Sequence, residues 1–242
     1  MLNIISVELT KMRKNKVFII SSIIFWGFLI LLMFTNSDLS LFPSHSVWLF
    51  QLTFVPNALL MVMSAFVLTT LIQREYQDHT MINVLTAPVT RTRFIISKLF
   101  AWLIWHLVTL VIGILLIVAG YFIFSESFFT PEIVNFVWNF TTIGLLSFIS
   151  MIPLIWVAIL QRKTFSPTII LGMGMAIMYM SVADHMILNY IPWSAVSIIG
   201  IGFSGSFSTI GMEHLIIGLT SIFATGILGL VFACLSFAKQ DQ

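Results

Sequence analysis

Charged residues are scarce in this chain. Only 8% of its 242 residues are Asp, Glu, Lys or Arg, whereas 59% are apolar types. An average soluble domain has roughly 25% charged residues, which solvate its surface. The composition therefore excludes a soluble domain and predicts a chain that is embedded in a membrane over nearly its whole length.

Several other features are missing as well. Cys234 is the single cysteine, which excludes a disulfide within the chain. The first apolar run is long and has no small-residue cleavage site, so we expect a retained anchor rather than a signal peptide. The motifs G-x-x-x-x-G-K-S/T, G-x-S-x-G and H-E-x-x-H do not occur. The chain therefore has no phosphate-binding loop with which to hold ATP, and none of these hydrolase signatures.

Basic residues are absent from every second connection between the apolar stretches. The connections without a base hold five acids, namely Asp38, Glu126, Glu132, Asp184 and Glu213. All 11 basic residues lie in the remaining connections and at the termini, at Lys11, Arg13, Lys14, Lys16, Arg74, Arg91, Arg93, Lys98, Arg162, Lys163 and Lys239. Cytoplasmic loops collect Lys and Arg. We therefore expect both termini in the cytoplasm, an even number of spans, and no nucleic-acid partner, since the charges serve membrane insertion.

The charge-free runs predict six membrane-spanning helices. A span needs about 20 consecutive apolar residues. The expected spans cover residues 17–34, 52–72, 98–124, 136–160, 167–188 and 214–237. The predicted fold class is therefore all-α, a polytopic membrane protein in which residues 1–242 form a single transmembrane domain.

The residues before the first span favour a helix on the inner membrane surface. Apolar side chains recur at helical spacing in residues 1–12, at Leu2, Ile5, Leu9 and Met12, whereas Glu8 and Lys11 fall between them. This pattern is typical of a short amphipathic helix that lies on a membrane. The alternative is a frayed basic tail that only orients the first span.

The uncharged residues 185–212 are expected to lie within the membrane without crossing it. They are rich in glycine and serine and contain Pro192. A seventh span here would move Lys239 to the outside and break the even count. We therefore expect a re-entrant segment, or a pair of surface-lying short helices, before the sixth span.

Histidines provide the few titratable groups near the spans. His106 lies inside the third span, and two interpretations are open: it lines a path, or it is a neutral imidazole bonded to a neighbouring helix. The pairs Asp184-His185 and Glu213-His214 mark the outer ends of spans. Metal ligands on a helix are usually four residues apart, so we expect no metal site from these adjacent pairs.

The connection between the second and third spans is the most informative segment. Residues 73–98 hold four bases and two acids in a loop that is too short to be a domain. An apolar ridge that includes Met81, Ile82 and Leu85 predicts a short helix, and Pro88 ends it. Such a loop either anchors the two spans or presents a docking surface to a cytoplasmic protein.

This segment resembles the ABC-2 family of ABC-transporter permeases. In that family the second span ends in Glu and an aromatic or polar residue, followed by Gly-Thr or Gly-Ser, a leucine-rich stretch, Pro, Arg, and Lys at the start of the third span. The matching positions are Glu75, Tyr76, Thr80, Leu85, Pro88, Arg91 and Lys98. His79 stands where the family usually has glycine. The resemblance covers the whole chain and is strongest to small permeases of the bacitracin- and lantibiotic-immunity type and to amphipathic-peptide exporters.

The resemblance implies the membrane subunit of an exporter in the bacterial plasma membrane. Two chains, alike or different, would form a twelve-span unit in the lipid, and each would bind a cytoplasmic ATPase subunit through loop 73–97. ATP and Mg would be bound by that ATPase, and no cofactor is expected on this chain. The expected ATPase-coupling residues are Glu75, Tyr76, Thr80, Met81, Ile82, Leu85, Pro88 and Arg91.

The apolar, Met-rich spans predict an amphiphilic substrate, either a peptide or a peptide antibiotic. Methionine suits promiscuous binding surfaces, although it also serves as ordinary packing. In the family the second and fifth spans lie near the dimer interface. The expected substrate-path residues are Asn57, Ser64, His106, Met175 and Tyr179. Gly172 and Ala176 form a small-xxx-small pair that lets two helices approach closely.

Two other classes of function stay open. A membrane-embedded protease or lipid-modifying enzyme would need several polar side chains together inside the bilayer, and His106 alone does not supply them. A non-transporting sensor or immunity protein is the second alternative. Copurification of an ATPase would separate an exporter subunit from both.

Overall fold

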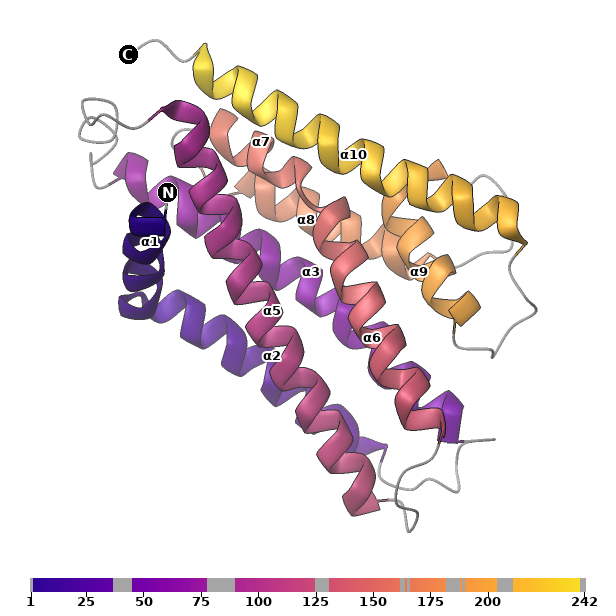
Figure 1. Cartoon of the computed structure of the whole chain (residues 1–242). Coiled ribbons are helices and arrows are strands. Elements are labelled where there is room, and N and C mark those ends of the chain that lie inside the picture. The colour runs from indigo at the N-terminus through magenta and orange to yellow at the C-terminus, as the bar shows by residue number, and fades with distance from the viewer. Residues whose placement is uncertain are drawn as a thin grey trace.

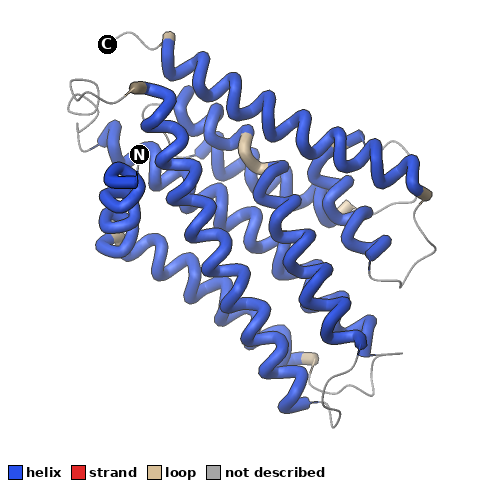
Figure 2. Tube along the Cα trace, viewed as in Figure 1, coloured by secondary structure: helices blue, strands red, loops and turns tan. Residues whose placement is uncertain are grey.

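The regular elements of this chain are α-helices. A computed structural model describes residues 2–36, 45–77, 90–124, 131–161, 164, 166–181, 188, 190–203 and 211–239, and it contains no strand in those ranges (Figure 2). In chain order the helices are α1 (Leu2–Lys14), α2 (Lys16–Thr35), α3 (His45–Gln77), α5 (Arg91–Phe124), α6 (Pro131–Ser150), α7 (Pro153–Leu160), α8 (Ser166–Met180), α9 (Pro192–Phe203) and α10 (Met212–Ala238). The predicted all-α class is confirmed.

Five helical stretches are long and apolar enough to cross a membrane within the described residues. They are Lys16–Thr35, Val47–Gln77, Arg91–Phe124, Pro131–Leu160 and Met212–Ala238. The fifth expected span, over residues 167–188, corresponds to α8, which has only 15 residues. At 1.5 Å per residue α8 is about 22 Å long, shorter than the hydrocarbon core of a bilayer.

The helices pack side by side, and α1 lies across one end of the bundle (Figure 1). The chain turns between α1 and α2 at Asn15, whose side chain accepts a hydrogen bond of 3.1 Å from the Val17 amide and caps α2. From this turn α1 packs against the beginning of α5. The face that α1 buries includes Met12 and also Glu8, a residue that the sequence pattern places off the apolar stripe.

The fourth expected span, over residues 136–160, is broken into α6 and α7. Proline has no amide hydrogen and clashes with the preceding helical turn, so the helix stops before Pro153. The Ser150 carbonyl freed at the break accepts a hydrogen bond of 3.0 Å from the Trp193 indole of α9. Gly229 of α10 lies against the break, where a Cβ atom would be 2.7 Å from the Pro153 backbone. The break is therefore closed by α9 and α10.

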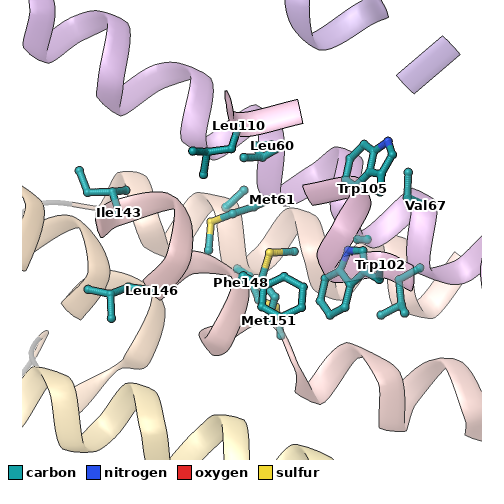
Figure 3. Packing of buried hydrophobic residues seen from close by; sticks show 14 of the residues in the cluster. Leu60, Met61, Val67, Trp102, Trp105, Leu110, Ile143, Leu146, Phe148 and Met151 are labelled. Atoms are coloured by element: carbon teal, nitrogen blue, oxygen red, sulfur yellow. The ribbon is translucent and has the colours of Figure 1, made fainter. Parts of the chain in front are cut away.

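The central helix is α3, which packs against α2, α5, α6, α7 and α8. Figure 3 shows its buried Met61 in the core together with Trp102 of α5 and Phe148 of α6. The Trp102 and Phe148 rings lie 4.5 Å apart between centroids. This packing buries the side chains of three spans against one another.

The outer surfaces of the bundle are apolar. Large hydrophobic side chains such as Leu31 of α2, Leu115 of α5 and Ile227 of α10 are exposed. A soluble protein rarely exposes so much contiguous apolar surface. Lipid is the environment that such a surface requires, so this chain is a multi-pass membrane protein.

A close helix contact that a single substitution can test lies between α8 and α3. A Cβ atom added at Gly172 would lie 2.3 Å from Ala65 Cβ, whereas one added at Gly174 would meet nothing within 4 Å. We expect Gly172→Ala to force α8 from α3 at a cost of about 1–3 kcal/mol, which lowers the melting temperature by roughly 2–10 °C. The shift is measured by heating the protein in detergent and monitoring the fraction that stays folded by size-exclusion chromatography. The control Gly174→Ala should leave the melting temperature unchanged or slightly higher, and equal effects of the two variants would refute the close contact.

Candidate functional site

Four ionisable side chains meet where α1, α3 and α5 come together. Lys98 Nζ lies 2.5 Å from Glu8 Oε2 and 2.8 Å from Glu75 Oε1. Lys11 Nζ lies 2.8 Å from the same Glu75 oxygen and 3.4 Å from Glu8 Oε1. The two ammonium groups donate and the two carboxylates accept. We call Glu8, Lys11, Glu75 and Lys98 the ion-pair cluster.

Three members of the cluster are buried, and only Lys11 of α1 is exposed to solvent. Lys98, Glu8 and Glu75 are only 2%, 4% and 5% exposed, whereas the Lys11 side chain is 48% exposed. The Lys98 ammonium also lies 5.2 Å from the centroid of the Phe94 ring. Charges taken out of water in this way are tolerated only when they are paired and hydrogen-bonded.

The pairing keeps Lys11 charged. Partial burial acts to lower the pKa of Lys11, but the hydrogen bond to Glu75 and the charge of Glu8 outweigh burial, and the pKa is raised above its ordinary value. Both carboxylates thus face a permanent positive charge at the entrance of the cluster.

Arg91 connects the beginning of α5 to the end of α10. Its guanidinium donates to the carbonyl of Ala238 at 2.6 Å and to that of Phe237 at 3.2 Å. The last carbonyls of a helix have no partner within the helix and carry partial negative charge, so a guanidinium there is favourable. The predicted coupling residue Arg91 therefore holds the C-terminal end of α10.

The expected coupling residues fall into two groups. Glu75, Tyr76 and Arg91 are described, and the loop residues Thr80, Met81, Ile82, Leu85 and Pro88 lie outside the described residues. Tyr76 is half-buried and lines a small cavity with Lys98 and Phe94. Glu75 belongs to the interior rather than to an exposed loop end, and a role of this group in coupling stays a prediction.

Gln73 connects the end of α3 to the chain between α7 and α8. Its side-chain amide donates to the carbonyl of Gln161 at 3.3 Å and to the carbonyl of Thr164. With the ion-pair cluster and Arg91, this contact brings α1, α3, α5 and α10 to the same end of the bundle (Figure 1). The ends of loop 73–97 are thus fixed to elements that are remote in sequence.

Sequence reasoning missed Glu8. It placed Glu8 off the apolar stripe of the first helix, where a charged residue usually faces water. The available signal was its position three residues before Lys11 and four before Met12, which is spacing that puts all three on neighbouring faces of one helix.

His106 lies in a buried polar contact between three spans. Its Nδ1 lies 3.2 Å from the Ser64 hydroxyl of α3, and its Nε2 lies 3.0 Å from the Gly144 carbonyl of α6. A carbonyl oxygen only accepts, so Nε2 donates to Gly144 and Nδ1 accepts from Ser64. The imidazole is therefore bonded to neighbouring helices, as one of its two interpretations predicts.

The other expected path residues are also inside the chain. Asn57 lies on the same face of α3 as Ser64 and donates to the Thr53 carbonyl at 2.8 Å. On another face of α3, the ring of Tyr179 stacks on Phe54 with centroids 5.0 Å apart. Met175, one turn before Tyr179, is buried there too. All five expected path residues are thus buried, and none is on the surface of the single chain.

No three metal-binding side chains come together in the described part of the chain. Glu213 and His214 lie in the first turn of α10. Asp184 and His185 lie outside the described residues.

The fold defines a class before any comparison is made: a helical multi-pass membrane protein with a buried ionic cluster at one end. The sequence profile described as "ABC-2 family transporter protein" matches residues 4–181. The bacitracin transport permease protein BCRB of Bacillus licheniformis is 32% identical over 172 residues, which cover 71% of this chain and 80% of that protein. The chain belongs to the ABC-2 family and is a membrane permease of an ABC transporter, as the resemblance predicted.

The ion-pair cluster can be tested by removing its most buried member. Lys98→Met removes the most buried ammonium group beside the carboxylates of Glu8 and Glu75, at a cost of about 3–5 kcal/mol. We expect the melting temperature to fall by roughly 6–20 °C. Arg93→Met is the matched control, because Arg93 is an exposed base five residues earlier in α5. Thermal unfolding of both purified variants decides: a Lys98→Met protein as stable as the control would contradict the cluster.

Proposed function

We propose that this chain is the membrane-spanning subunit of an exporter that moves an amphiphilic peptide or peptide antibiotic outward. A separate cytoplasmic subunit binds ATP and Mg and hydrolyses the ATP, and this chain binds no cofactor. The observation that carries the proposal is the fixed frame around loop 73–97. Its beginning is held by Glu75 and Gln73, and its end by Lys98 and Arg91.

The frame supports a mechanism in which a docked ATPase moves α3 and α5 together. A force on the loop acts on helix ends that are bonded to α1 through Glu8 and to α10 through Arg91. Packed helices move as rigid bodies with small shifts between them. Closure of the ATPase pair therefore tilts four helices at once, and the substrate path changes with them.

The proposed topology has six spans with both termini in the cytoplasm. The support is that α1 and the end of α10 lie at the same end of the bundle (Figure 1), which is the end that carries Lys11, Arg91 and Lys98. In this topology α8 belongs to the fifth span. The re-entrant segment includes α9, whose 12 residues extend about 18 Å and cannot cross a bilayer. The buried Ala195, Val196 and Ile199 of α9 pack it into the bundle.

The proposed assembly contains two permease chains, either alike or different, in the lipid of a bacterial plasma membrane. Two ATPase subunits dock on its cytoplasmic side. The relative from Bacillus licheniformis is named for bacitracin transport, which agrees with an amphiphilic peptide as substrate. The apolar outer surfaces of α2, α5 and α10 supply the lipid contact.

A membrane-embedded enzyme is less well supported. Ser64 and His106 form a hydroxyl–imidazole pair, which is the kind of arrangement that activates a nucleophile. Both side chains are completely buried, however, and the second imidazole nitrogen is bonded to the Gly144 carbonyl. A substrate carbonyl cannot reach the hydroxyl in this arrangement, so the pair serves helix packing.

The docking role of loop 73–97 is testable with the apolar ridge. Met81→Asp together with Leu85→Asp should abolish copurification of the ATPase, because a buried unpaired carboxylate at an interface costs several kcal/mol. The control is Thr92→Asp, an exposed position in the first turn of α5, where an acid is favourable. ATPase pull-down and transport are measured for both.

Full transport and ATPase recovery in the ridge variant would reduce the loop to a linker and remove the proposal's local support. The same pull-down tests the orientation, because a loop outside the cell cannot reach a cytoplasmic protein.

A further inference from the structure

A small cavity with several polar side chains in a mainly apolar wall lies between α3, α6 and α9. Its volume is about 60 Å³, and its wall includes Thr53 of α3, Asn135 and Asn139 of α6, and Gly200 of α9. Thr53 and Glu75 are 22 residues apart on α3, or about 33 Å along the helix, so the cavity is at the opposite end from the ion-pair cluster. A water needs about 10–15 Å³ of such space. The cavity therefore holds one small polar group rather than a whole amphiphile.

A polar stripe on α6 leads into this cavity. Glu132, Asn135 and Asn139 follow one another at intervals of three and four residues, which places them on one face of the helix. The Glu132 side chain is 39% exposed at the rim, and Asn139 is 6% exposed at the bottom. Asn139 Oδ1 has no hydrogen-bond partner within the described ranges. An unpaired buried carboxamide is costly, so its retention points to a ligand that pairs with it.

The opposite wall adds acceptors. Thr53 lines the cavity, and because its hydroxyl donates to the Leu49 carbonyl at 2.9 Å, its oxygen is left with acceptor lone pairs only. At the rim, His45 Nδ1 lies 3.8 Å from a Glu132 carboxylate oxygen, longer than a hydrogen bond. A group that only donates hydrogen bonds matches this wall, and a positive charge matches the carboxylate.

We propose that this cavity binds the ammonium or guanidinium group of a cationic amphiphile. Glu132 attracts the charge at the rim, and Thr53 and Asn139 accept its N–H groups at the bottom. Phe50 and Phe136, which also line the cavity, contact the adjoining apolar part and favour a cation through their ring faces. The inference rests on the proposed function and narrows its substrate class to amphiphiles with a primary amine or a guanidinium.

Three probes of equal chain length separate the contribution of positive charge from that of N–H donors. Tritiated dodecylamine carries charge and N–H donors, dodecyltrimethylammonium carries charge without donors, and dodecanol carries no charge. Binding is measured on the full chain in phosphatidylcholine nanodiscs without ATPase, and empty nanodiscs are subtracted. We expect the two competitors to displace dodecylamine at least about tenfold more weakly than unlabelled dodecylamine does, because charge-assisted hydrogen bonds are roughly twice as strong as neutral ones.

Variants locate the binding. Glu132→Gln and Asn139→Leu should each weaken dodecylamine binding about tenfold. Glu213→Gln removes the same charge from an exposed position at the start of α10, outside the cavity, and should change binding less than twofold. Should Asn139→Leu fail to fold, Thr53→Val tests the opposite wall with a side chain of the same shape.

Two results would overturn the site: equal competition by all three probes, or equal loss of binding in Glu213→Gln and Glu132→Gln, which would indicate partition to a charged surface. These results are distinguishable from failure of the proposed function, because the binding assay contains no ATPase. Loss of ATPase pull-down with dodecylamine binding intact would refute the exporter proposal alone.

Discussion

The Lys98 ammonium, held between two buried carboxylates, is the interaction on which the rest of the structure depends. It joins Glu8 of α1 to Glu75 of α3, two residues that are far apart in the chain, at the point where α5 begins. A buried ion pair stabilises a fold little compared with apolar residues of the same volume, but breaking one is expensive. The cluster links α1, α3 and α5 at this end of the bundle, so removal of one of its members would leave buried charges where these three helices meet.

Bonds to other helices hold both ends of loop 73–97. Glu75 and Lys98 lie on either side of loop 73–97, and Arg91 at the start of α5 bonds to the last carbonyls of α10. In the proposed mechanism, movement of the loop reaches α1 and α10 through these bonds, without passing through the membrane interior. Deeper in the bundle, His106 bonds α5 to both α3 and α6. In the proposed mechanism the same movement therefore continues along the spans as one packed unit.

Composition and charge pattern were sufficient to predict an all-α membrane protein. Spans in lipid must be apolar and helical, and basic residues collect in the loops on one side, so both features can be read from the sequence. The family resemblance also identified both Glu75 and Lys98. Local spacing places Glu8 on a face next to Met12, but it could not identify the partner of Glu8, since Lys98 lies 90 residues away. The break before Pro153 was missed because an apolar run reads as one span, although a proline inside a helix removes a backbone hydrogen bond and often breaks the helix. The cavity around Asn139 could not be predicted, because it forms only when α3, α6 and α9 pack together. The helix α8 is also shorter than the span that the apolar run predicts.

The central claim is that Glu8 and Lys98 act as one unit, and a double-mutant cycle tests it most directly. Glu8→Gln, Lys98→Met and the double variant are compared by their free energies of unfolding in detergent. Because the double variant removes both a buried charge and its partner, it should be more stable than the sum of the single effects predicts, by about 1–3 kcal/mol. Single effects that add to within about 0.5 kcal/mol would show that the two residues are independent, and would contradict the account.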